Sequence, residues 1–517
     1  MTISSNFFPE VDQSSQEQWE KFLKAELKLE DISSKTRKNS PDGLWPTLSL
    51  RSESPVQIPS HSAWKKAAQT YVHPPQKQTV LEDLSHGVKT FFIEKDFWKQ
   101  DQLDQFFTIL ASANSPQELE VFLLGDQKLS AKNNSFLVVD ESEFIHGRGA
   151  FAPGGNNIQE LTQISTSLIS SLSDARPTYF IAVFIGPQFF RNIAKIRAAR
   201  LLSKKILDEA GLSSDIRIVA LTSYREWTLF ERYSNVLRND AAVASAYIAG
   251  ADHIQSSGYQ SIFELETSDM SKEHSARSNR IARNTSHILA LESLLGVVGD
   301  AAFGSYHIES LTQELCEKSW NTMQEFLPIS EKQHSEEMMK VTTPVREERR
   351  RQMNTRKMVV AGINDFPDSL EELKDISIKK RFYRLAHDFE ELRLKMQKSP
   401  QRPEVTIALF GDYGALNGRI NFVKNYFELL GLKVNDPAHS VTDKAVFQKN
   451  LQNQESKILV LCSSDELYPE IAPLVQGVKA GEKFIAGKVE VAGFKNLTAG
   501  QNVYDILSGL VQKWSGQ

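Results

Sequence analysis

The sequence predicts an α/β protein with parallel sheets, and three observations lead to this fold class. Residues 178–185 and 216–221 are apolar runs rich in aromatic and β-branched side chains, which is typical of strands buried on both faces. Between them, residues 189–210 repeat apolar side chains three or four positions apart, which predicts a helix capped by Gly211. Strand, helix and strand predict a βαβ unit, and the alternation continues over about 260 residues.

Length and composition narrow the class of protein. A chain of 517 residues suggests two or three domains, because one hydrophobic core rarely serves so many residues. The net charge of −5 and the pI near 6.2 give no reason to expect nucleic acid or an anionic membrane as a partner. Cys316 and Cys462 have no neighbours at metal-ligand spacing, so we expect buried, reduced thiols. We find no secretory signal and no apolar run of ~20 residues, and we expect a cytoplasmic protein.

Residues 1–60 are predicted to form an N-terminal arm. Residues 16–29 can form an amphipathic helix, because Trp19, Phe22 and Leu27 fall on one face. The stretch that follows is rich in serine, proline and charge and offers no compact core. The apolar face of this helix therefore needs another surface, which is either the rest of the chain or a partner protein.

Residues 61–327 are predicted to form the first α/β domain. The length fits a (β/α)8 barrel, and periodicity alone leaves a doubly wound sheet as the alternative. The sequence predicts strands near residues 88–93, 118–124, 135–139, 178–185 and 216–221, and helices near 102–113, 157–173, 189–210, 236–250 and 308–327.

Residues 328–403 are predicted to be a charged, helical linker without a core of its own. Its basic run at 346–357 lacks interleaved aromatic residues, so we interpret the run as a solvated helix face and not as a nucleic-acid patch.

Residues 404–517 are predicted to form a second α/β domain with a flavodoxin-like doubly wound sheet. We expect strands at 405–410, 457–463 and 483–489, a loop at 411–418, a helix that begins near Ile420 and is capped by Gly431, and a closing helix at 502–514.

Two segments resemble the sequence patterns of one known family. Residues 189–200 read FFRNIAKIRAAR, and residues 276–312 contain RIARNT, a Glu-Ser pair and a GSY-x-x-E-x-LT run. These patterns are similar to those of the adenosylcobalamin-dependent acyl-CoA mutases. Within them, the chain resembles the methylmalonyl-CoA mutase family and its small, or β, subunit. The resemblance implies a (β/α)8 barrel followed by a degenerate cobalamin-binding domain, and it favours the barrel over the doubly wound alternative.

The resemblance also shows where the cobalt ligand is missing. Family mutases carry D-x-H-x-x-G in the loop after the first strand of the cobalamin domain, with the histidine on cobalt and the aspartate orienting it. Here the aspartate position is Tyr413, the histidine position is Ala415 and the final glycine is Gly418. Asp412 replaces the aspartate only after a shift of one residue, and no histidine follows it. We therefore expect this chain to bind no cofactor and no metal.

The catalytic histidine of the family is also replaced. It precedes a helix containing Q-E-L, which residues 159–161 match. An ungapped count puts Gly149 at the histidine position and Arg148 at the tyrosine position; a gap would bring His146 close. We expect no catalytic residue in this chain, and His146 is the one candidate.

Charged residues of the two matched segments are expected to be structural. At helical spacing such groups more often form ion pairs in a barrel shell than take part in catalysis. This expectation covers Arg197, Arg200, Arg280, Arg283, Asn284, Glu292 and Asp300.

The resemblance implies a non-catalytic small subunit of a heterodimeric methylmalonyl-CoA mutase. Trp19, Asp31 and Asp42-Gly43 resemble the arm of such small subunits, so the arm at residues 1–60 is expected to wrap the partner subunit. The large subunit would bind adenosylcobalamin and interconvert succinyl-CoA and methylmalonyl-CoA, because the radical chemistry belongs to the cofactor. Two alternatives stay open. One is a self-sufficient acyl-CoA mutase with unusual cobalamin ligation, and the other is a free-standing pseudoenzyme that binds a different partner.

Overall fold

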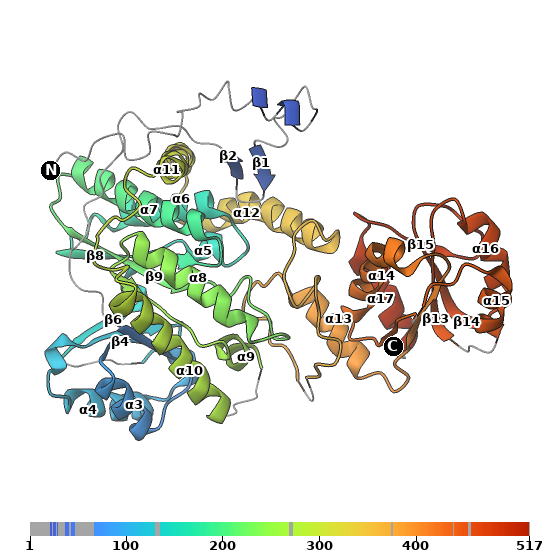
Figure 1. Ribbon diagram of the computed structural model, residues 1–517. Coiled ribbons are helices and arrows are strands. Elements are labelled where there is room, and N and C mark those ends of the chain that lie inside the picture. The colour runs from blue at the N-terminus through green and yellow to red at the C-terminus, as the bar shows by residue number, and fades with distance from the viewer. Residues whose placement is uncertain are drawn as a thin grey trace, which may run out of the picture.

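The computed structural model contains a larger and a smaller α/β body, joined by helices (Figure 1). It describes short pieces between residues 21 and 46, and then residues 67–129, 135–267, 272–373, 376–437, 439–452 and 456–515. In these residues no helix is long and apolar enough to cross a membrane.

The predicted N-terminal arm lies mostly outside the described residues. Trp19 and Leu27 are outside them, and Phe22 is described with two-thirds of its surface exposed. Two short strands, β1 (Arg37–Ser40) and β2 (Gly43–Pro46), pair antiparallel.

In the described residues, the larger body holds eight parallel strands in two four-stranded sheets. Neighbours in each sheet are consecutive in sequence, and no strand pair among the described residues joins β6 to β7 or β10 to β3. The first sheet contains β3 (Ala67–Tyr71), β4 (Val88–Glu94), β5 (Glu120–Leu124) and β6 (Leu137–Asp140), and the second contains β7 (Phe144–His146), β8 (Thr178–Ile185), β9 (Asp215–Thr222) and β10 (His253–Ile254).

The two sheets face each other around one apolar core. Phe92 and Phe122 from the first sheet share a buried cluster with Phe144, Val219 and Leu221 from the second. Each strand packs one face against this core and the other face against helices. Both faces are therefore buried, which explains the continuously apolar sequences of the strands.

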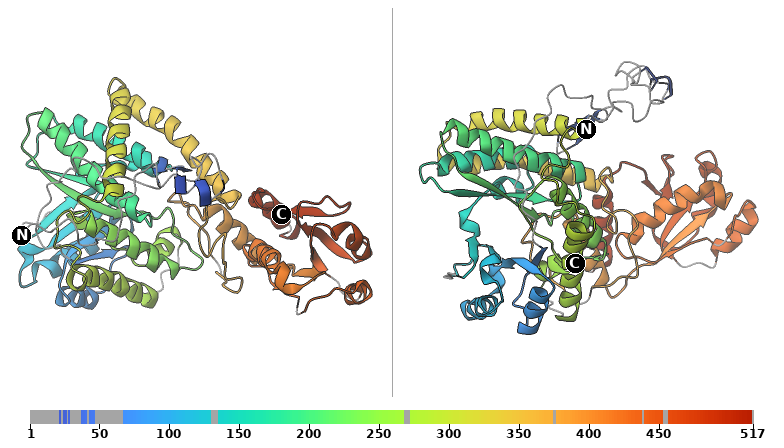
Figure 2. Two further views of the ribbon diagram at one scale, coloured as in Figure 1. Left: turned by 45° about the horizontal axis from the view of Figure 1, so that its top comes forward. Right: turned by 60° about the vertical axis from the view of Figure 1, so that its left-hand side comes forward.

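Helices cover the outer faces of both sheets (Figure 2). Their apolar sides pack on the strands, in keeping with the three-to-four-residue spacing of the sequence. The first sheet is covered by α3 (Lys77–Ser85) and α4 (Gln100–Ala111), and the second by α6 (Asn157–Ser171), α7 (Phe189–Glu209), α8 (Ser234–Ile248) and α11 (Tyr306–Phe326). The remaining helices of this body are α5 (Arg148–Phe151), α9 (Ser261–Glu266) and α10 (Lys272–His287).

The predicted βαβ unit is confirmed. β8 and β9 pair in parallel from Thr178 with Asp215 to Ile185 with Thr222, and α7 connects them. Gly211 follows α7 with a φ of +70°, the left-handed conformation expected at a helix end. The strands β3, β7 and β10 were not predicted, because they are only two to five residues long and carry little periodicity.

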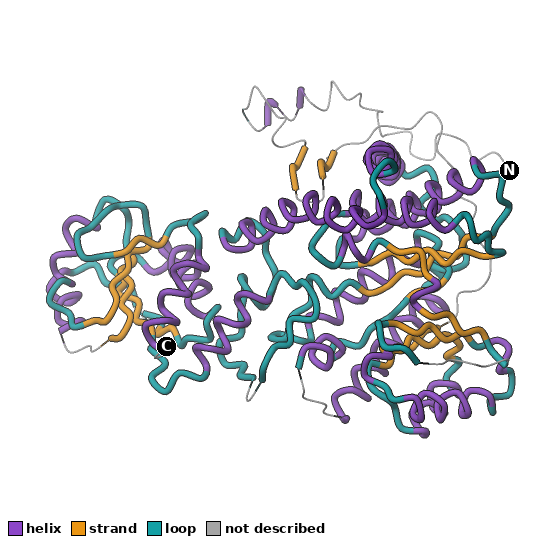
Figure 3. Tube along the Cα trace, turned by 180° about the vertical axis from the view of Figure 1, so that it is seen from behind, coloured by secondary structure: helices purple, strands orange, loops and turns teal. Residues whose placement is uncertain are grey.

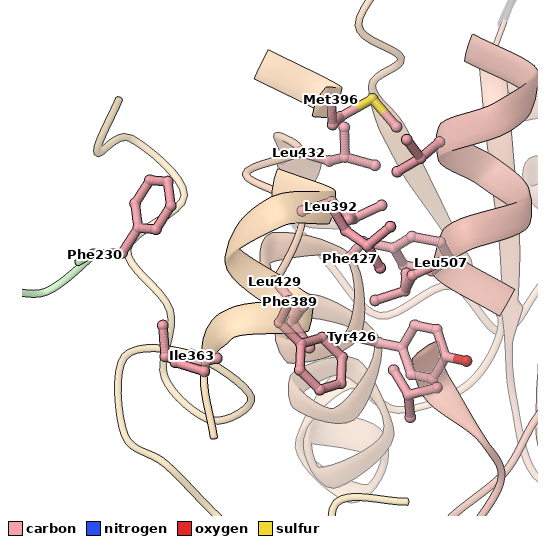
Figure 4. Packing of buried hydrophobic residues seen from close by; sticks show 14 of the residues in the cluster. Phe230, Ile363, Phe389, Leu392, Met396, Tyr426, Phe427, Leu429, Leu432 and Leu507 are labelled. Atoms are coloured by element: carbon pink, nitrogen blue, oxygen red, sulfur yellow. The ribbon is translucent and has the colours of Figure 1, made fainter. Parts of the chain in front are cut away.

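The predicted linker does more than connect the two bodies. It contains α12 (Glu331–Asn354) and α13 (His387–Gln397). Phe389 and Leu392 of α13 are buried in a hydrophobic cluster that includes Phe230 of the larger body and Leu507 of the smaller one (Figure 4). The linker therefore takes part in one core that runs through all three regions.

The basic run of the linker is only partly a solvated face, which corrects the prediction. Arg350 and Arg351 are exposed, but Arg349 is buried. Its guanidinium donates to the backbone carbonyls of Gly154 and Gly155 and so attaches α12 to the larger body.

The smaller body is a five-stranded parallel sheet with helices on both faces (Figure 3). The strand order β12-β11-β13-β14-β15 is 2-1-3-4-5 in sequence terms. The strands are β11 (Val405–Leu409), β12 (Val434–Asn435), β13 (Ser456–Cys462), β14 (Ala480–Ala486) and β15 (Lys495–Leu497); the helices are α14 (Tyr413–Glu428), α15 (Lys444–Gln452), α16 (Tyr468–Val475) and α17 (Val503–Trp514).

The loop predicted at residues 411–418 is wrong for most of its length. α14 begins at Tyr413, because the Asp412 carboxylate accepts a hydrogen bond of 2.7 Å from the Ala415 amide and caps the helix. Only Phe410, Gly411, with a φ of +131°, and Asp412 separate the strand from the helix.

Candidate functional site

Parallel strands bring their carboxyl ends to one edge of a sheet, where ligand sites of α/β proteins lie. This chain has two such edges. One is in the larger body, and the other is in the smaller body after β11 and β13.

The larger body holds a cavity of about 390 Å³ at the carboxyl ends of its strands. Residues 381–383 of the linker form part of its wall, and Glu266 accepts hydrogen bonds from the amides of Arg381 and Phe382. The cavity is lined by Glu94, Asp96, Leu124, Gly125, Asp126, Arg148, Phe151, Ala152, Phe184, Leu221, Thr222, Ser223, Tyr224, Arg225, Gln255, Arg381, Phe382 and Tyr383.

Glu94 is the titrating group of this cavity. Burial raises the pKa of its carboxyl to about 7, and the nearby Glu141 and Asp96 carboxylates add to the rise while Arg148 opposes it. A carboxyl group that exchanges its proton near neutral pH suits general acid–base chemistry.

The cavity arginines are engaged by the protein. Arg148 forms an ion pair of 2.5 Å with Glu141. Arg225 donates to the Phe151 carbonyl at 2.8 Å, and its guanidinium carbon lies 3.8 Å from the centroid of the Phe151 ring. These contacts fix both guanidinium groups in the cavity wall.

Tyr224 contributes a hydroxyl that stays protonated. Its oxygen lies 3.1 Å from the Ser257 hydroxyl, and burial raises the pKa of the phenol well above its usual value. The cavity therefore suits a small polar molecule held beside one titrating carboxyl group.

Neither predicted histidine position reaches the cavity wall. His146 ends β7, and its Nδ1 accepts a weak hydrogen bond of 3.3 Å from the Arg148 amide; burial lowers its pKa. Gly149 lies in α5 against α6, and a Cβ there would approach the Gln163 amide nitrogen to 2.4 Å. A side chain at 149 would displace Gln163 before it could reach a ligand.

The second edge is closed by the helix that follows β11. Ala415 lies in the first turn of α14, and Tyr413 donates its amide to the Ser440 hydroxyl at 2.8 Å. A Cβ on Gly418 would meet open space, so no neighbouring atom of this chain requires a glycine at this position. The D-x-H-x-x-G positions are thus ordinary positions of a capped helix.

Arg419 fills this edge further along α14. Its guanidinium donates to the carbonyls of Ser463 at 2.7 Å and Ala486 at 2.9 Å, at the ends of β13 and β14. It also lies 3.1 Å from the Tyr468 hydroxyl and 2.7 Å from the Asp465 carboxylate. Arg419 thus bonds to carbonyls at the ends of both strands, and the Ala486 carbonyl also accepts a hydrogen bond of 2.6 Å from the Tyr468 hydroxyl.

Cobalamin ligation does not fit this second edge. The alanine methyl at position 415 has no lone pair for cobalt, and Arg419 is a donor at all its nitrogens. Within the described parts of the chain, no group of three His, Cys, Asp or Glu side chains could hold a metal ion.

The structural interpretation of the matched charged residues is confirmed for Arg197, Arg200, Arg283 and Asp300, which form ion pairs. Arg197 pairs with Asp300 at 2.6 Å and with Glu309 at 2.7 Å. Arg200 pairs with Asp252 at 2.7 Å, and Arg283 pairs with Asp83. Arg280, Asn284 and Glu292 are exposed.

Sequence reasoning missed Glu94, the residues 381–383 and Arg419. Glu94 ends an apolar strand, where a carboxylate could have been noticed. The other two depend on contacts between distant segments, so local patterns give no signal for them.

The fold and its two edges define an α/β protein with parallel sheets whose second ligand edge is closed. The family model for methylmalonyl-CoA mutase matches residues 174–406. Over this region the chain is similar to the methylmalonyl-CoA mutase family, and the relatives that it resembles include several methylmalonyl-CoA mutase small subunits.

The similarity to individual relatives covers part of each chain. A methylmalonyl-CoA mutase small subunit from Porphyromonas gingivalis is 30% identical over 60% of this chain and 52% of its own length. The small subunit from Propionibacterium freudenreichii subsp. shermanii is 28% identical over 59% of this chain and 49% of its own length. A methylmalonyl-CoA mutase from Rhizobium meliloti is 29% identical over 50% of this chain and 31% of its own length. The matched region thus spans about half the length of these small subunits.

Proposed function

We propose that this chain is the non-catalytic small subunit of a heterodimeric methylmalonyl-CoA mutase. Its large subunit carries adenosylcobalamin and the interconversion of succinyl-CoA and methylmalonyl-CoA, and this chain stabilises that subunit. The observation that carries the proposal is the closed edge of the smaller body, with Ala415 inside a capped helix and Arg419 across the strand ends.

We also propose a specific fold for each of the two bodies. We take the eight parallel strands as a (β/α)8 barrel, supported by the core that both sheets share. We take the smaller body as a flavodoxin-like, cobalamin-binding-like domain, supported by its strand order 2-1-3-4-5. The free thiols of Cys316 and Cys462 support a cytoplasmic location.

A cobalamin titration followed by visible absorbance tests this function. The full chain is titrated alone and again with the large subunit. We expect uptake only in the mixture. Stoichiometric uptake by the chain alone would overturn the proposal. We also expect no uptake by Ala415→His alone, because α14 and Arg419 still occupy the edge.

The cavity with Glu94 favours a second candidate, a self-sufficient acyl-CoA mutase with unusual cobalamin ligation. That enzyme would turn over acyl-CoA and cobalamin without the large subunit. Turnover by the isolated chain, lost in Glu94→Gln, would establish this candidate. A third candidate, a free-standing pseudoenzyme, predicts that the large subunit does not bind at all.

A further inference from the structure

The segment between α10 and α11 presents a dense row of apolar side chains to solvent. A π-helix at Ile288–Glu292 (η4) continues α10, and an irregular stretch leads to Tyr306. Between 44% and 57% of the surface is exposed on Ile288, Leu291, Leu294, Val297, Val298, Phe303 and Tyr306, which we call the 288–306 surface. Phe190 of α7 is half exposed beside it, with its ring centroid 5.7 Å from that of His307.

The 288–306 surface is held in a defined shape. The buried Arg197 guanidinium pairs with Asp300 inside the segment and with Glu309 just after it. Glu309 also accepts from the Gly304 amide at 3.0 Å. Inward-facing neighbours such as Ala290 and Ala302 are buried in the core of the second sheet. The outward apolar side chains are therefore presented on a rigid base, which lowers the entropic cost of binding.

Leu294 combines two unfavourable features. Its side chain is 52% exposed, so the hydrophobic core gains little from it. Its φ is +55°, a left-handed conformation that glycine, asparagine and aspartate adopt more readily than leucine. Neither local backbone preference nor core packing explains a leucine here, whereas an apolar contact with another molecule would.

The size of the surface suits a protein interface. Seven large side chains, each about half exposed, provide on the order of 600 Å² of apolar area, the upper end of what a monomer presents in one patch. A standard interface buries about 800 Å² on each partner, and somewhat more than half of this area is apolar. The 288–306 surface can therefore supply the apolar centre of a stable interface.

We propose that the 288–306 surface docks the large subunit of the mutase. This inference rests on the proposed function and assigns the partner to a face of this chain. Glu292 is exposed within the surface, and no cation among the described residues pairs with it. The complementary face of the large subunit is therefore apolar, with a lysine or arginine opposite Glu292.

Binding of the full chain to the large subunit, measured by titration calorimetry, tests the inference. The variant carries Leu294→Asn and Val298→Ser, and we expect binding about a hundredfold weaker, since each lost central contact costs about tenfold. Its melting temperature should equal or exceed that of the wild type, because asparagine accepts a positive φ. The matched control carries Leu370→Asn and Val446→Ser, which are 85% and 50% exposed at other sites, and it should bind like the wild type.

The outcomes separate this inference from the proposed function. If the wild type binds the large subunit and the Leu294→Asn, Val298→Ser variant binds equally well, the docking surface is wrong and the subunit role stands. If the wild type does not bind the large subunit, both are overturned. If the wild type alone forms a dimer that only this variant breaks, the occupant is a second copy of the chain and the assignment to the large subunit is overturned.

Discussion

Both bodies of this chain have an edge where the carboxyl ends of parallel strands meet, but a cavity lies at one edge, whereas Arg419 crosses the strand ends at the other. The larger body keeps a cavity of about 390 Å³ beside a carboxyl group with a pKa near 7. In the smaller body, Arg419 bonds to the strand ends itself. The comparison shows that topology only decides where a ligand site can form. Individual side chains decide whether space and unused polar groups remain there.

The largest expected effect comes from Arg419→Met. The substitution leaves the Ser463 and Ala486 carbonyls and the Asp465 carboxylate without their shared donor, so we expect a loss of about 3 kcal/mol in the free energy of unfolding. Urea unfolding of the full chain measures it. The matched control is Arg217→Met, because Arg217 is as exposed as Arg419 but pairs with the Asp215 carboxylate and, among the described residues, bonds no strand-end carbonyl, and it should cost less than about 0.5 kcal/mol. Equal losses in both variants would contradict the role of Arg419 as the group that closes this edge.

Glu94→Gln is expected to have an intermediate and pH-dependent effect. The folded chain holds the Glu94 proton more tightly than the unfolded chain, so wild-type stability falls as the pH rises from about 4.5 to about 7. Glutamine does not ionise, so the Glu94→Gln variant does not lose this stability as the pH rises. The variant should match the wild type near pH 4.5 and be more stable by up to about 3 kcal/mol above pH 7.

Unfolding free energies measured from pH 5 to pH 8 check the effect of Glu94→Gln. Asp140→Asn is the control, because hydrogen bonds from Lys95 and Ser142 outweigh burial and lower the pKa of the Asp140 carboxyl, so its difference from the wild type should stay constant over this range. A constant difference between the Glu94→Gln variant and the wild type across this range would show that Glu94 does not titrate in it.

Gly418→Ala is expected to have the smallest effect, and it is stabilising. Gly418 lies inside α14, and an added Cβ would meet open space. Alanine favours a helix over glycine by about 0.5–1 kcal/mol, so the melting temperature should rise slightly. Gly411→Ala should instead destabilise, because its φ is +131°. A destabilising Gly418→Ala would indicate that residues 411–418 form a loop and not a helix.

Much of the fold could be predicted from the sequence, because the long elements carry a clear period. The strands at 178–185 and 216–221 and the helix between them were placed to within one or two residues. The start of α14 was misplaced because glycines at 411, 414 and 418 favour a loop, whereas the Asp412 cap decides for a helix.

The candidate sites were less predictable. That Ala415 and Gly149 bring no chemistry to the positions where the family has histidines stays a prediction from the sequence. It could not reveal that Arg419 reaches two strand ends 44 and 67 residues away. Such contacts depend on the assembled fold, and a single sequence carries no periodic signal for them.

The hydrophobic cluster shared by α13, the smaller body and Phe230 has a consequence for truncation of this chain. Removing the residues after 404 would expose Phe389, Leu392 and Met396 to water. The smaller body therefore serves the stability of its neighbour whether or not it binds a ligand of its own, and the chain behaves as one cooperative unit across the linker.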